Sequence, residues 1–539
     1  MKSLILFACL LLTTVVHAGV NLKNGNFYKS YTDIIVPGGG NDLEINRTYN
    51  SKSIDKGWFG FGWGSDYETY LTVSADGSVV VHENGAGADT RFTPKKSVNA
   101  AEASKKIVEA MRKKGATFTE KDAKDFISKL EKDAELRQAY ARKFNVTAKL
   151  ATGTILYSNI RGLQQLHKIK TGYKRVYNDG KVEFFNDQGK LTKMADKNGY
   201  WVKLSYKNGR VADIKDSQAK QLFFSWYPDG KVKHIWSAGD KKTTYKYKGD
   251  DLVESTDIGG NVYKYDYDRK HNMTKISYSD KSTLEISYHP KNQFVSEVKN
   301  RNGETTGYEY GNDPKNPDLH YWTTVTKKGV SGRTIKNKYE YEIKARPDGS
   351  TYTYRVATDI NGLKTETVYS ECCGLPLKIT RGKHVTSFDY NDRGLLKKKS
   401  STKGEYVELD YHKKFNKITK VVNNKGWTKF EYDQKGNLKK AENNKGKSVL
   451  LVYDRKGRIK KMIDKEKSKK PRQLAFKYNA LGKPIEISMG KMKINVAYDN
   501  YGDIKKVESK AGHKMALQVT QAFQSLLAIV KPAGVNLSL

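Results

Sequence analysis

The sequence has only three cysteines among its 539 residues, and this scarcity limits how the fold can be held together. Cys372 and Cys373 are adjacent, and Cys9 lies in an apolar segment near the amino terminus. Secreted folds that depend on disulfides carry several cysteines spread along the chain, so a disulfide framework is excluded. For Cys372 and Cys373 three interpretations stay open: a vicinal disulfide that locks a tight turn, two free thiols, and a metal or redox site. No histidine pair near them in the sequence supports a metal.

Long apolar runs are also absent after the first 18 residues. A membrane-spanning helix needs about 18 or more apolar residues, and no later segment approaches that length. The first 18 residues are typical of a secretory signal peptide, with Lys2, an apolar stretch over 4–16 and a cut between Ala18 and Gly19. The residues before Cys9 resemble a lipoprotein cleavage box but lie too early in the chain. We therefore predict an exported protein, in the periplasm, on the outer surface or secreted.

Catalytic signatures are missing as well. The chain contains no His-Glu-x-x-His zinc site, no Gly-x-Ser-x-Gly elbow and no phosphate-binding loop, and its ten histidines are scattered. The run from Gly60 to Gly64 superficially resembles a nucleotide loop, but its aromatic strand context favours structural packing. We predict a protein that is not an enzyme and uses no cofactor or metal. A glycan-processing enzyme is the least favoured alternative.

Hydrophobic residues are scarce too, at 37% of the chain, and the mean hydropathy is −0.74. These values alone could indicate disorder. The 11% of aromatic residues, with 35 tyrosines, argue against it, because disordered chains are poor in aromatics. The formal net charge is +39 and comes mostly from lysine. Such a surface either attracts a polyanion or merely solvates an exposed sheet and protects its edges.

Internal repetition is the strongest positive signal. Anchor tyrosines follow one another at intervals of 21 residues, and two further anchors continue the series: Tyr369, Tyr390, Tyr411, Tyr432, Tyr453, then Tyr478 and Tyr498. An earlier run extends from Phe185 through Tyr206, Tyr227, Tyr247, Tyr267, Tyr288 and Tyr310, with Tyr341 as the expected anchor in a looser stretch. A chain of this length with such a period is expected to form a repeat array.

Each unit has the pattern of a β-hairpin. In one unit, Tyr432 is followed by a turn that ends at Gly436, and in the next, Tyr453 is followed by Gly457. Glycine is expected at these two positions because the turn requires positive φ. A second turn rich in Asn and Gly separates two short strands that alternate in polarity. One hairpin cannot bury its face alone, so the units must stack laterally.

The unit Tyr-Asp-x-x-Gly-Arg/Asn-Leu/Ile resembles the YD repeat of Rhs proteins, wall-associated bacterial proteins, insecticidal toxin complexes and teneurins. The best copies are residues 432–438 and 453–459. Residues 20–94 are similar to the amino-terminal domain that precedes such repeats, through Arg47 to Ser51 and Gly57 to Trp63. The resemblance covers roughly four-fifths of the chain. It implies a mainly β fold in which a spiral YD-repeat sheet forms a partial or complete hollow shell.

Two features depart from that family. Residues 97–147 do not follow the repeat, and Asn99 and Thr119 are expected to begin two helices. We predict a helical hairpin that acts as a lid, a plug or a docking element. The self-cleavage motif and a recognisable carboxy-terminal toxin domain are also missing, so the shell is expected to be small, open or completed by a partner. The predicted division is a signal peptide (1–18), an amino-terminal Rhs-type β domain (19–95), the insert (96–150), the YD array (151–510) and a tail with a short helix (511–539).

Lysine pairs recur seven and eight residues after several anchors. The first lysines of these pairs are candidates for binding a polyanion: Lys397, Lys439, Lys460 and Lys505. Because neighbouring strand residues point to opposite faces, we expect one lysine of each pair outside and the other on the concave side.

The favoured function is an exported scaffold that binds or encloses a partner at the cell envelope or a target cell surface, the partner being an anionic polymer, a cell-surface glycan or a separate protein. The alternative is a component of a toxin-delivery or effector-encapsulating system with a separate cargo polypeptide. Nucleic acid is not an expected partner of an exported protein.

Overall fold

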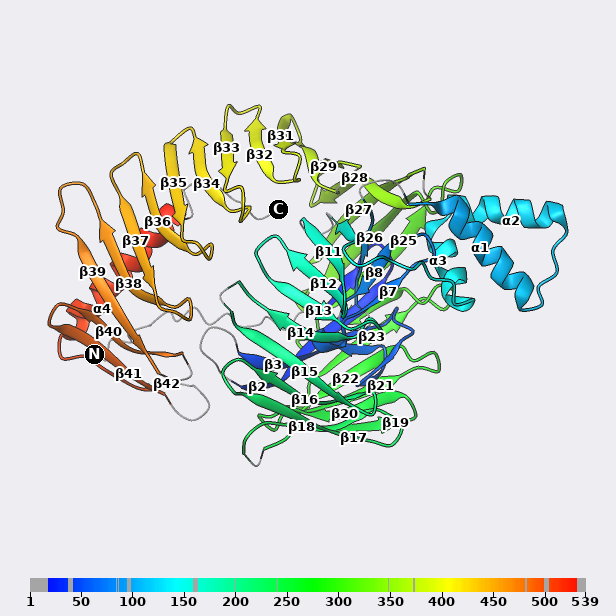
Figure 1. The fold of residues 1–539 in the computed structure, drawn as a ribbon, viewed down its shortest axis with the longest axis horizontal. Helices are drawn as coiled ribbons and strands as arrows, with labels where there is room; N and C mark the ends of the chain where they lie inside the picture. The colour runs from blue at the N-terminus through cyan, green and yellow to red at the C-terminus, as the bar shows by residue number, and fades with distance from the viewer. Residues whose placement is uncertain are drawn as a thin grey trace.

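The computed structural model describes residues 18–36, 42–83, 85, 87–94, 98–158, 163–197, 199–239, 241–347, 349–371, 374–479, 482–498 and 504–530. These residues form a spiral of antiparallel strands, an amino-terminal β domain inside its first part, a helical insert and a carboxy-terminal helix (Figure 1). The predicted mainly β fold with a spiral YD-repeat sheet is confirmed. No helix among the described residues is long and apolar enough to cross a membrane.

The amino-terminal domain contains three small sheets. The first has the order β1-β2-β3-β6, with β1 (Ala18–Asn21), β2 (Asn26–Val36), β3 (Leu43–Asn50) and β6 (Trp63–Ser65). The second pairs β4 (Lys56–Gly57) with β5 (Gly60–Phe61), and the third contains β7 (Tyr70–Val73), β8 (Val79–His82) and β9 (Asp89–Phe92). A 3-10 turn, η1 (Asp66–Glu68), follows β6.

The insert contains three helices rather than the two of the predicted hairpin: α1 (Ala100–Lys113), α2 (Glu120–Lys132) and α3 (Ala134–Lys143). Asn99 and Thr119 cap the first two helices, as predicted, by accepting hydrogen bonds from the backbone of the third residue after each. The third helix begins directly after the second because Asp133 accepts a hydrogen bond from the Leu136 N–H and so starts a new helix.

The spiral starts with a nine-stranded sheet in sequence order. Its strands are β10 (Ile155–Ser158), β11 (Gln164–Ile169), β12 (Gly172–Tyr177), β13 (Val182–Phe185), β14 (Leu191–Ala195), β15 (Trp201–Lys207), β16 (Arg210–Asp216), β17 (Gln221–Trp226) and β18 (Val232–Trp236).

A 24-stranded sheet, also in sequence order, continues the spiral. Its strands are β19 (Thr244–Lys248), β20 (Asp251–Thr256), β21 (Val262–Tyr267), β22 (Met273–Tyr278), β23 (Thr283–Tyr288), β24 (Val295–Lys299), β25 (Thr305–Asn312), β26 (His320–Lys328), β27 (Thr334–Ala345), β28 (Thr351–Ile360), β29 (Leu363–Tyr369), β30 (Pro376–Arg381), β31 (His384–Tyr390), β32 (Leu396–Ser401), β33 (Tyr406–Tyr411), β34 (Ile418–Asn423), β35 (Gly426–Tyr432), β36 (Leu438–Asn443), β37 (Ser448–Tyr453), β38 (Ile459–Lys465), β39 (Arg472–Tyr478), β40 (Pro484–Met489), β41 (Met492–Tyr498) and β42 (Ile504–Glu508).

The amino-terminal domain fills the first part of the spiral. One continuous core, called here the first core, joins buried residues from 27–92 to buried residues from 156–295. At its centre Arg47 is fully buried and pairs with Asp33 at 2.8 Å, while the Tyr245 hydroxyl donates to the same carboxylate at 2.8 Å. A buried charge is tolerated only when it is paired, so this network fixes the domain against strands that lie 200 residues later in the sequence.

The last helix, α4 (Gly512–Val530), covers the final part of the spiral. Its apolar residues Met515, Val519 and Ala522 are buried against a second core, which draws on strands from β33 to β41. The helix lies within the tail, 511–539, for which a short helix is predicted. Between the two cores, strands β28 to β31 form an arc (Figure 1), and among the described residues neither core includes a residue of these strands, although Lys23 of the amino-terminal domain donates to Thr353 of β28 at 2.7 Å.

Candidate functional site

The YD turn is built by its aspartate and its glycine. Asp433 accepts hydrogen bonds from the backbone N–H groups of Lys435 and Asn437, at 2.9 and 2.8 Å. The Gly436 N–H donates to the Asp433 carbonyl at 3.0 Å, and Gly436 has a φ of +80°. Side-chain caps of this kind are typical of aspartate in turns, and positive φ favours glycine. The turn after Asp454 repeats this arrangement, with Gly457 at φ +80°.

A β-bulge accompanies nearly every anchor. Tyr432 pairs with Leu438 and Glu431 pairs with Lys440, so Lys439 is an extra residue with no partner in β35. The same shift occurs at Tyr390, Tyr411, Tyr453, Tyr478 and Tyr498. In two units the sequence placed the anchor wrongly: the bulge falls at Trp226 rather than Tyr227, and at Ile343 rather than Tyr341.

The bulge decides where the lysine pairs point. Leu438 and Ala441 both pack into the second core on the face that carries the anchor tyrosines, called here the inner face. Lys439 and Lys440 lie between them, and because the bulge adds one residue, both point to the opposite, outer face. The prediction that one lysine of each pair faces inward is therefore wrong.

The four candidate lysines are the extra residues of four bulges, and all are exposed: Lys397, Lys439, Lys460 and Lys505. Three of the four lysines that follow them form ion pairs: Lys398, Lys440 and Lys506. Lys398 lies 3.0 Å from Glu408, and Lys440 lies 2.8 Å from Glu442. Within the described part of the chain, no carboxylate lies within ion-pair distance of the four bulged lysines, so their charges face solvent.

The inner face of the arc differs from the inner face of the first part of the spiral in the exposure of its side chains. One row crosses neighbouring strands there, and its members are partly accessible: Val356, Thr367, Ile379 and Thr386. An equivalent row in the first part of the spiral contains Leu204, Ile214 and Leu222, which are at most 3% exposed. Within the described residues, the arc therefore presents a row of β-branched side chains that stays partly accessible.

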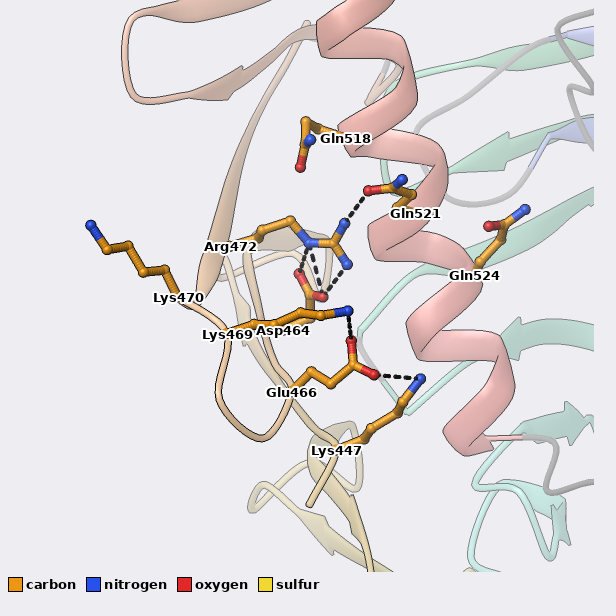
Figure 2. Close-up of a pocket in the computed structure, with 9 residues that line it drawn as sticks. All are labelled: Lys447, Asp464, Glu466, Lys469, Lys470, Arg472, Gln518, Gln521 and Gln524. Carbon is orange, nitrogen blue, oxygen red and sulfur yellow. Dashed lines mark hydrogen bonds and ion pairs between the residues drawn. The ribbon is translucent and has the colours of Figure 1, made fainter. Parts of the chain in front are cut away.

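A polar cleft of about 580 Å³ lies between α4 and the turn that joins β38 to β39 (Figure 2). Arg472 bonds Asp464 at 3.1 Å and Gln521 at 2.7 Å, and the Glu466 carboxylate lies 2.8 Å from Lys469. Lys469 and Lys447 hold the pKa of Glu466 below its ordinary value. Every lining residue is charged or an amide, and the acidic groups are already neutralised. Sequence reasoning did not find this cleft because its lining residues come from two separate segments, 447–472 and 518–524.

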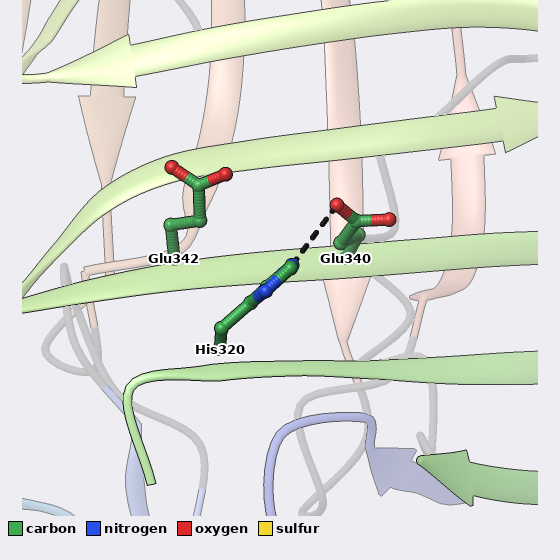
Figure 3. A group of neighbouring side chains, drawn as sticks. All are labelled: His320, Glu340 and Glu342. Atoms are coloured by element: carbon green, nitrogen blue, oxygen red, sulfur yellow. Dashed lines mark hydrogen bonds and ion pairs between the residues drawn. The ribbon is translucent and has the colours of Figure 1, made fainter. Parts of the chain in front are cut away.

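A second cluster, on the outer face, brings His320, Glu340 and Glu342 within 4.8 Å of one another (Figure 3). Arg355 forms ion pairs with both glutamates, and Lys338 lies 2.9 Å from Glu340. These cations lower the pKa of each carboxyl, with Lys338 the main cause at Glu340 and Arg355 at Glu342. A metal ion would have to displace Arg355, so the cluster is an ion-pair network.

One hydroxyl–imidazole–carboxylate chain occurs in the amino-terminal domain. His82 is hydrogen-bonded to Thr72 at 2.9 Å through Nε2 and to Asp89 at 2.8 Å through Nδ1. The Tyr70 ring stacks on the imidazole at 4.5 Å, and His82 is 5% exposed. This arrangement ties three neighbouring strands together, and the buried imidazole offers no open face to a substrate.

Some predicted sites lie outside what the structure describes. Cys372 and Cys373 are outside the described residues, so their redox state stays a prediction. The signal segment 1–17 is outside them as well. Gly19 is part of β1, where it pairs with Tyr28.

A family model described as Teneurin YD-shell matches residues 164–537, and a domain of unknown function, DUF6531, matches residues 17–92. A search of curated proteins found no match. Among solved structures, the chain is similar to a crystal structure of TcdB2-TccC3-TEV, with 10% identity, a TM-score of 0.40, and 94% of this chain and 30% of that chain covered. It is also similar to the Photorhabdus luminescens Tc holotoxin pore, with 9% identity, a TM-score of 0.39, and 89% and 29% covered. The chain therefore spans less than a third of the length of these two proteins.

Proposed function

The chain belongs to the Teneurin YD-shell family, and on this basis we propose that it is an exported, non-enzymatic scaffold that binds or encloses a partner at the cell envelope or a target cell surface. The partly accessible inner row of the arc, as far as the described residues show it, is the observation that carries the proposal. The first part of the spiral is filled by the chain's own amino-terminal domain, and α4 occupies the last part. The accessible row over β28 to β31 is where a partner would contact the inside of the shell.

Site-directed photo-cross-linking tests this assignment. Thr367 lies on the inner face, and its neighbour Glu366 lies on the outer face, where it pairs with Arg355 at 3.0 Å. A photo-reactive residue at position 367 should cross-link a partner in the cells that produce the protein, and one at position 366 should not. Equal cross-linking from both positions, or none from either, would argue against an inner binding face.

Export is tested separately. We propose cleavage after Ala18, so amino-terminal sequencing of the mature protein should begin at Gly19. Recovery of intact Met1 from the cytosol would contradict export.

The second candidate function is a component of a system that encapsulates a separate cargo polypeptide. The accessible inner row of the arc, among the described residues, favours it, because an enclosed cargo could contact the shell there. Mass spectrometry of the species cross-linked at position 367 separates the two candidates. A polypeptide that leaves the cell together with the protein supports the cargo function, and a surface glycan or polymer supports the scaffold.

A further inference from the structure

The polar cleft between α4 and the turn that joins β38 to β39 is not used by the proposed function (Figure 2). Its volume of about 580 Å³ lies in the range of small-ligand pockets, about 300–1,000 Å³. The lining comes from two segments, 447–472 and 518–524, so the cleft forms only when α4 packs on the second core. These segments lie outside the arc, and the cleft is therefore a separate candidate site.

The charges in the cleft disfavour a cationic ligand. Asp464 accepts hydrogen bonds from the Arg472 guanidinium at 3.1 Å. Glu466 forms ion pairs with Lys469 at 2.8 Å and with Lys447 at 3.2 Å. Both carboxylates are therefore neutralised by the chain itself. The lining holds four Lys and Arg side chains against these two carboxylates, a surplus of two positive charges, and this balance favours a ligand with negative charge.

The helix α4 supplies a row of amides to the other wall of the cleft. Gln518, Gln521 and Gln524 are spaced three residues apart and all line the cleft. Gln521 accepts a 2.7 Å hydrogen bond from Arg472, and this bond holds the helix against the strands. Within the part of the chain that the structure describes, the side chains of Gln518 and Gln524 form no hydrogen bond. Each of these amides offers both donors and an acceptor to a ligand.

The class of ligand follows from the groups that line the cleft. Every lining residue is charged or an amide, so an apolar molecule gains little contact there. A sugar hydroxyl both donates and accepts, as a side-chain amide does, whereas a carboxylate only accepts. An acidic peptide would need apolar contacts for its side chains or a free sheet edge, but β37, β38 and β39 are each paired on both sides. A row of amides beside a surplus of cations therefore fits a short chain of sugars that carries carboxylate groups.

We propose that this cleft binds an acidic oligosaccharide, with sugar hydroxyls on the amides of Gln518 and Gln524 and a sugar carboxylate on Lys469. The Lys469 side chain is 70% exposed, so its flexible stem can bring the ammonium group to a ligand. Lys447 stays beside Glu466 and keeps that carboxylate paired when Lys469 turns toward the sugar. The site therefore gains a contact with the ligand without leaving a charge of its own unpaired.

Isothermal titration calorimetry of the full chain with a trisaccharide of galacturonic acid tests the proposal. The uncharged trisaccharide of galactose should bind about tenfold more weakly, because it lacks the carboxylates. The double change Gln518→Ala and Gln524→Ala should weaken binding of the acidic trisaccharide about tenfold, the worth of two hydrogen bonds. Thr520→Ala is the matched control and should leave the affinity unchanged, since Thr520 is an exposed residue of α4 outside the cleft lining.

A second variant tests the charged wall of the cleft. Lys469→Gln should weaken the acidic trisaccharide about fivefold and leave the neutral one unchanged. Lys467→Gln, in the same turn but outside the cleft lining, should change neither. No binding of the acidic trisaccharide, or equal effects of the cleft and control changes, would overturn the proposal. Binding of a glutamate-rich peptide in place of the trisaccharide would overturn it in favour of a peptide site.

The two variants also separate a folding defect from a loss of binding. If circular dichroism shows that the double glutamine variant is unfolded, the exposed Lys469 decides alone. Neither variant alters the inner face of the arc, so the cross-linking expected at position 367 can fail while this inference stands.

Discussion

The hydroxyl group of Tyr453 donates a 2.8 Å hydrogen bond to the carbonyl oxygen of Leu438, the residue directly before the bulged Lys439. The bond crosses from one repeat to the previous one. Ten other anchors form the same bond at 2.6 to 2.9 Å: Tyr206, Tyr247, Tyr267, Tyr288, Tyr310, Tyr390, Tyr411, Tyr432, Tyr478 and Tyr498. A bulge disturbs the ladder locally, and the hydroxyl satisfies a carbonyl at that point. At these anchors the bond depends on the tyrosine hydroxyl, which a phenylalanine such as the anchor Phe185 cannot supply.

Tyr453→Phe should destabilise the array by about 1 kcal/mol, because it removes this bond and leaves the Leu438 carbonyl without its partner. Burial raises the pKa of Tyr453 to about 12, so the hydroxyl stays a donor at neutral pH. Chemical denaturation followed by circular dichroism measures the change. Tyr406→Phe is the matched control, since Tyr406 lies in β33 but is not an anchor, and it should leave stability unchanged. Equal stability of the two variants would remove the proposed role of the hydroxyl.

Gly436→Val should cost more, about 1–3 kcal/mol for backbone strain alone, because Gly436 has a φ of +80° and a β-branched residue resists positive φ. A Cβ atom there would also lie 3.0 Å from the Phe415 ring. Gly404 has the same φ with nothing within 4 Å, so Gly404→Val isolates the strain from the contact. Thermal melting should fall for both variants, and further for Gly436→Val. An unchanged melting temperature in both would mean that these glycines are not strained turns.

The repeats could be predicted because each YD turn is encoded within a few residues. Asp433, Gly436 and Asn437 bond one another inside a single turn, and the 21-residue period follows from repetition. The bulge could not be predicted in the same way, because it is a difference in register between two strands. It reversed the expected direction of half of the lysines. The burial of Arg47 was equally hidden, since its partner Tyr265 lies more than 200 residues away.

The site was less predictable than the fold for the same reason. The arc is accessible because, among the described residues, neither core includes residues of its strands. That depends on where the amino-terminal domain and α4 lie, which no local sequence pattern encodes. Thr367 and Thr386 stand at inner-face positions where the first part of the spiral has leucine. The sequence alone does not show that these two residues face inward, so it does not predict the accessible row.

The stability of the spiral should depend on pH through Lys417. The ammonium groups of Lys417 and Lys197 both donate to the Gly436 carbonyl at 2.9 Å, and this joins the early strands to the late ones. Burial first, and Lys197 second, lower the pKa of Lys417 to about 8, while Asp179 and Asp433 act in the opposite direction. The unfolded lysine keeps a pKa near its ordinary 10.5, so the unfolded chain binds more protons between these values. Stability from this contact should therefore rise as pH increases from about 8 to about 10.5.

Lys197→Gln removes the like charge and should reduce that rise. Melting temperatures at several pH values between 7 and 10 measure this increase in stability. The comparison is between the variant and the natural sequence at each pH. Lys207→Gln, an exposed lysine on β15, is the control for general loss of charge. If the two variants depend on pH in the same way, the shared carbonyl is not the cause.

The bulged lysines should bind a polyanion on the outer face. Residues 411–472 hold 21 Lys and Arg against 6 Asp and Glu, a net charge of +15. Lys439 and Lys460 lie on β36 and β38, two strand spacings or about 10 Å apart, which is close to one Debye length at moderate salt. A flexible polyanion can follow such a row, whereas a compact anion would reach one lysine at a time. The affinity for heparin should be measured across a salt series. The logarithm of the binding constant should fall steeply with the logarithm of the salt concentration.

Changing Lys439, Lys460 and Lys505 to Gln should lower that slope by roughly 3, one unit for each lost phosphate-like contact. The same three changes at Lys105, Lys113 and Lys121 of the helical insert remove equal charge from another surface. If attraction is only a matter of net charge, the two triple variants will bind alike. If the bulges serve solely to keep the sheet soluble, heparin will bind both as well as it binds the natural sequence. Loss of heparin binding confined to the bulge variant would show that this row itself binds heparin, because each of its lysines is the extra residue of a bulge and none has a carboxylate within ion-pair distance among the described residues.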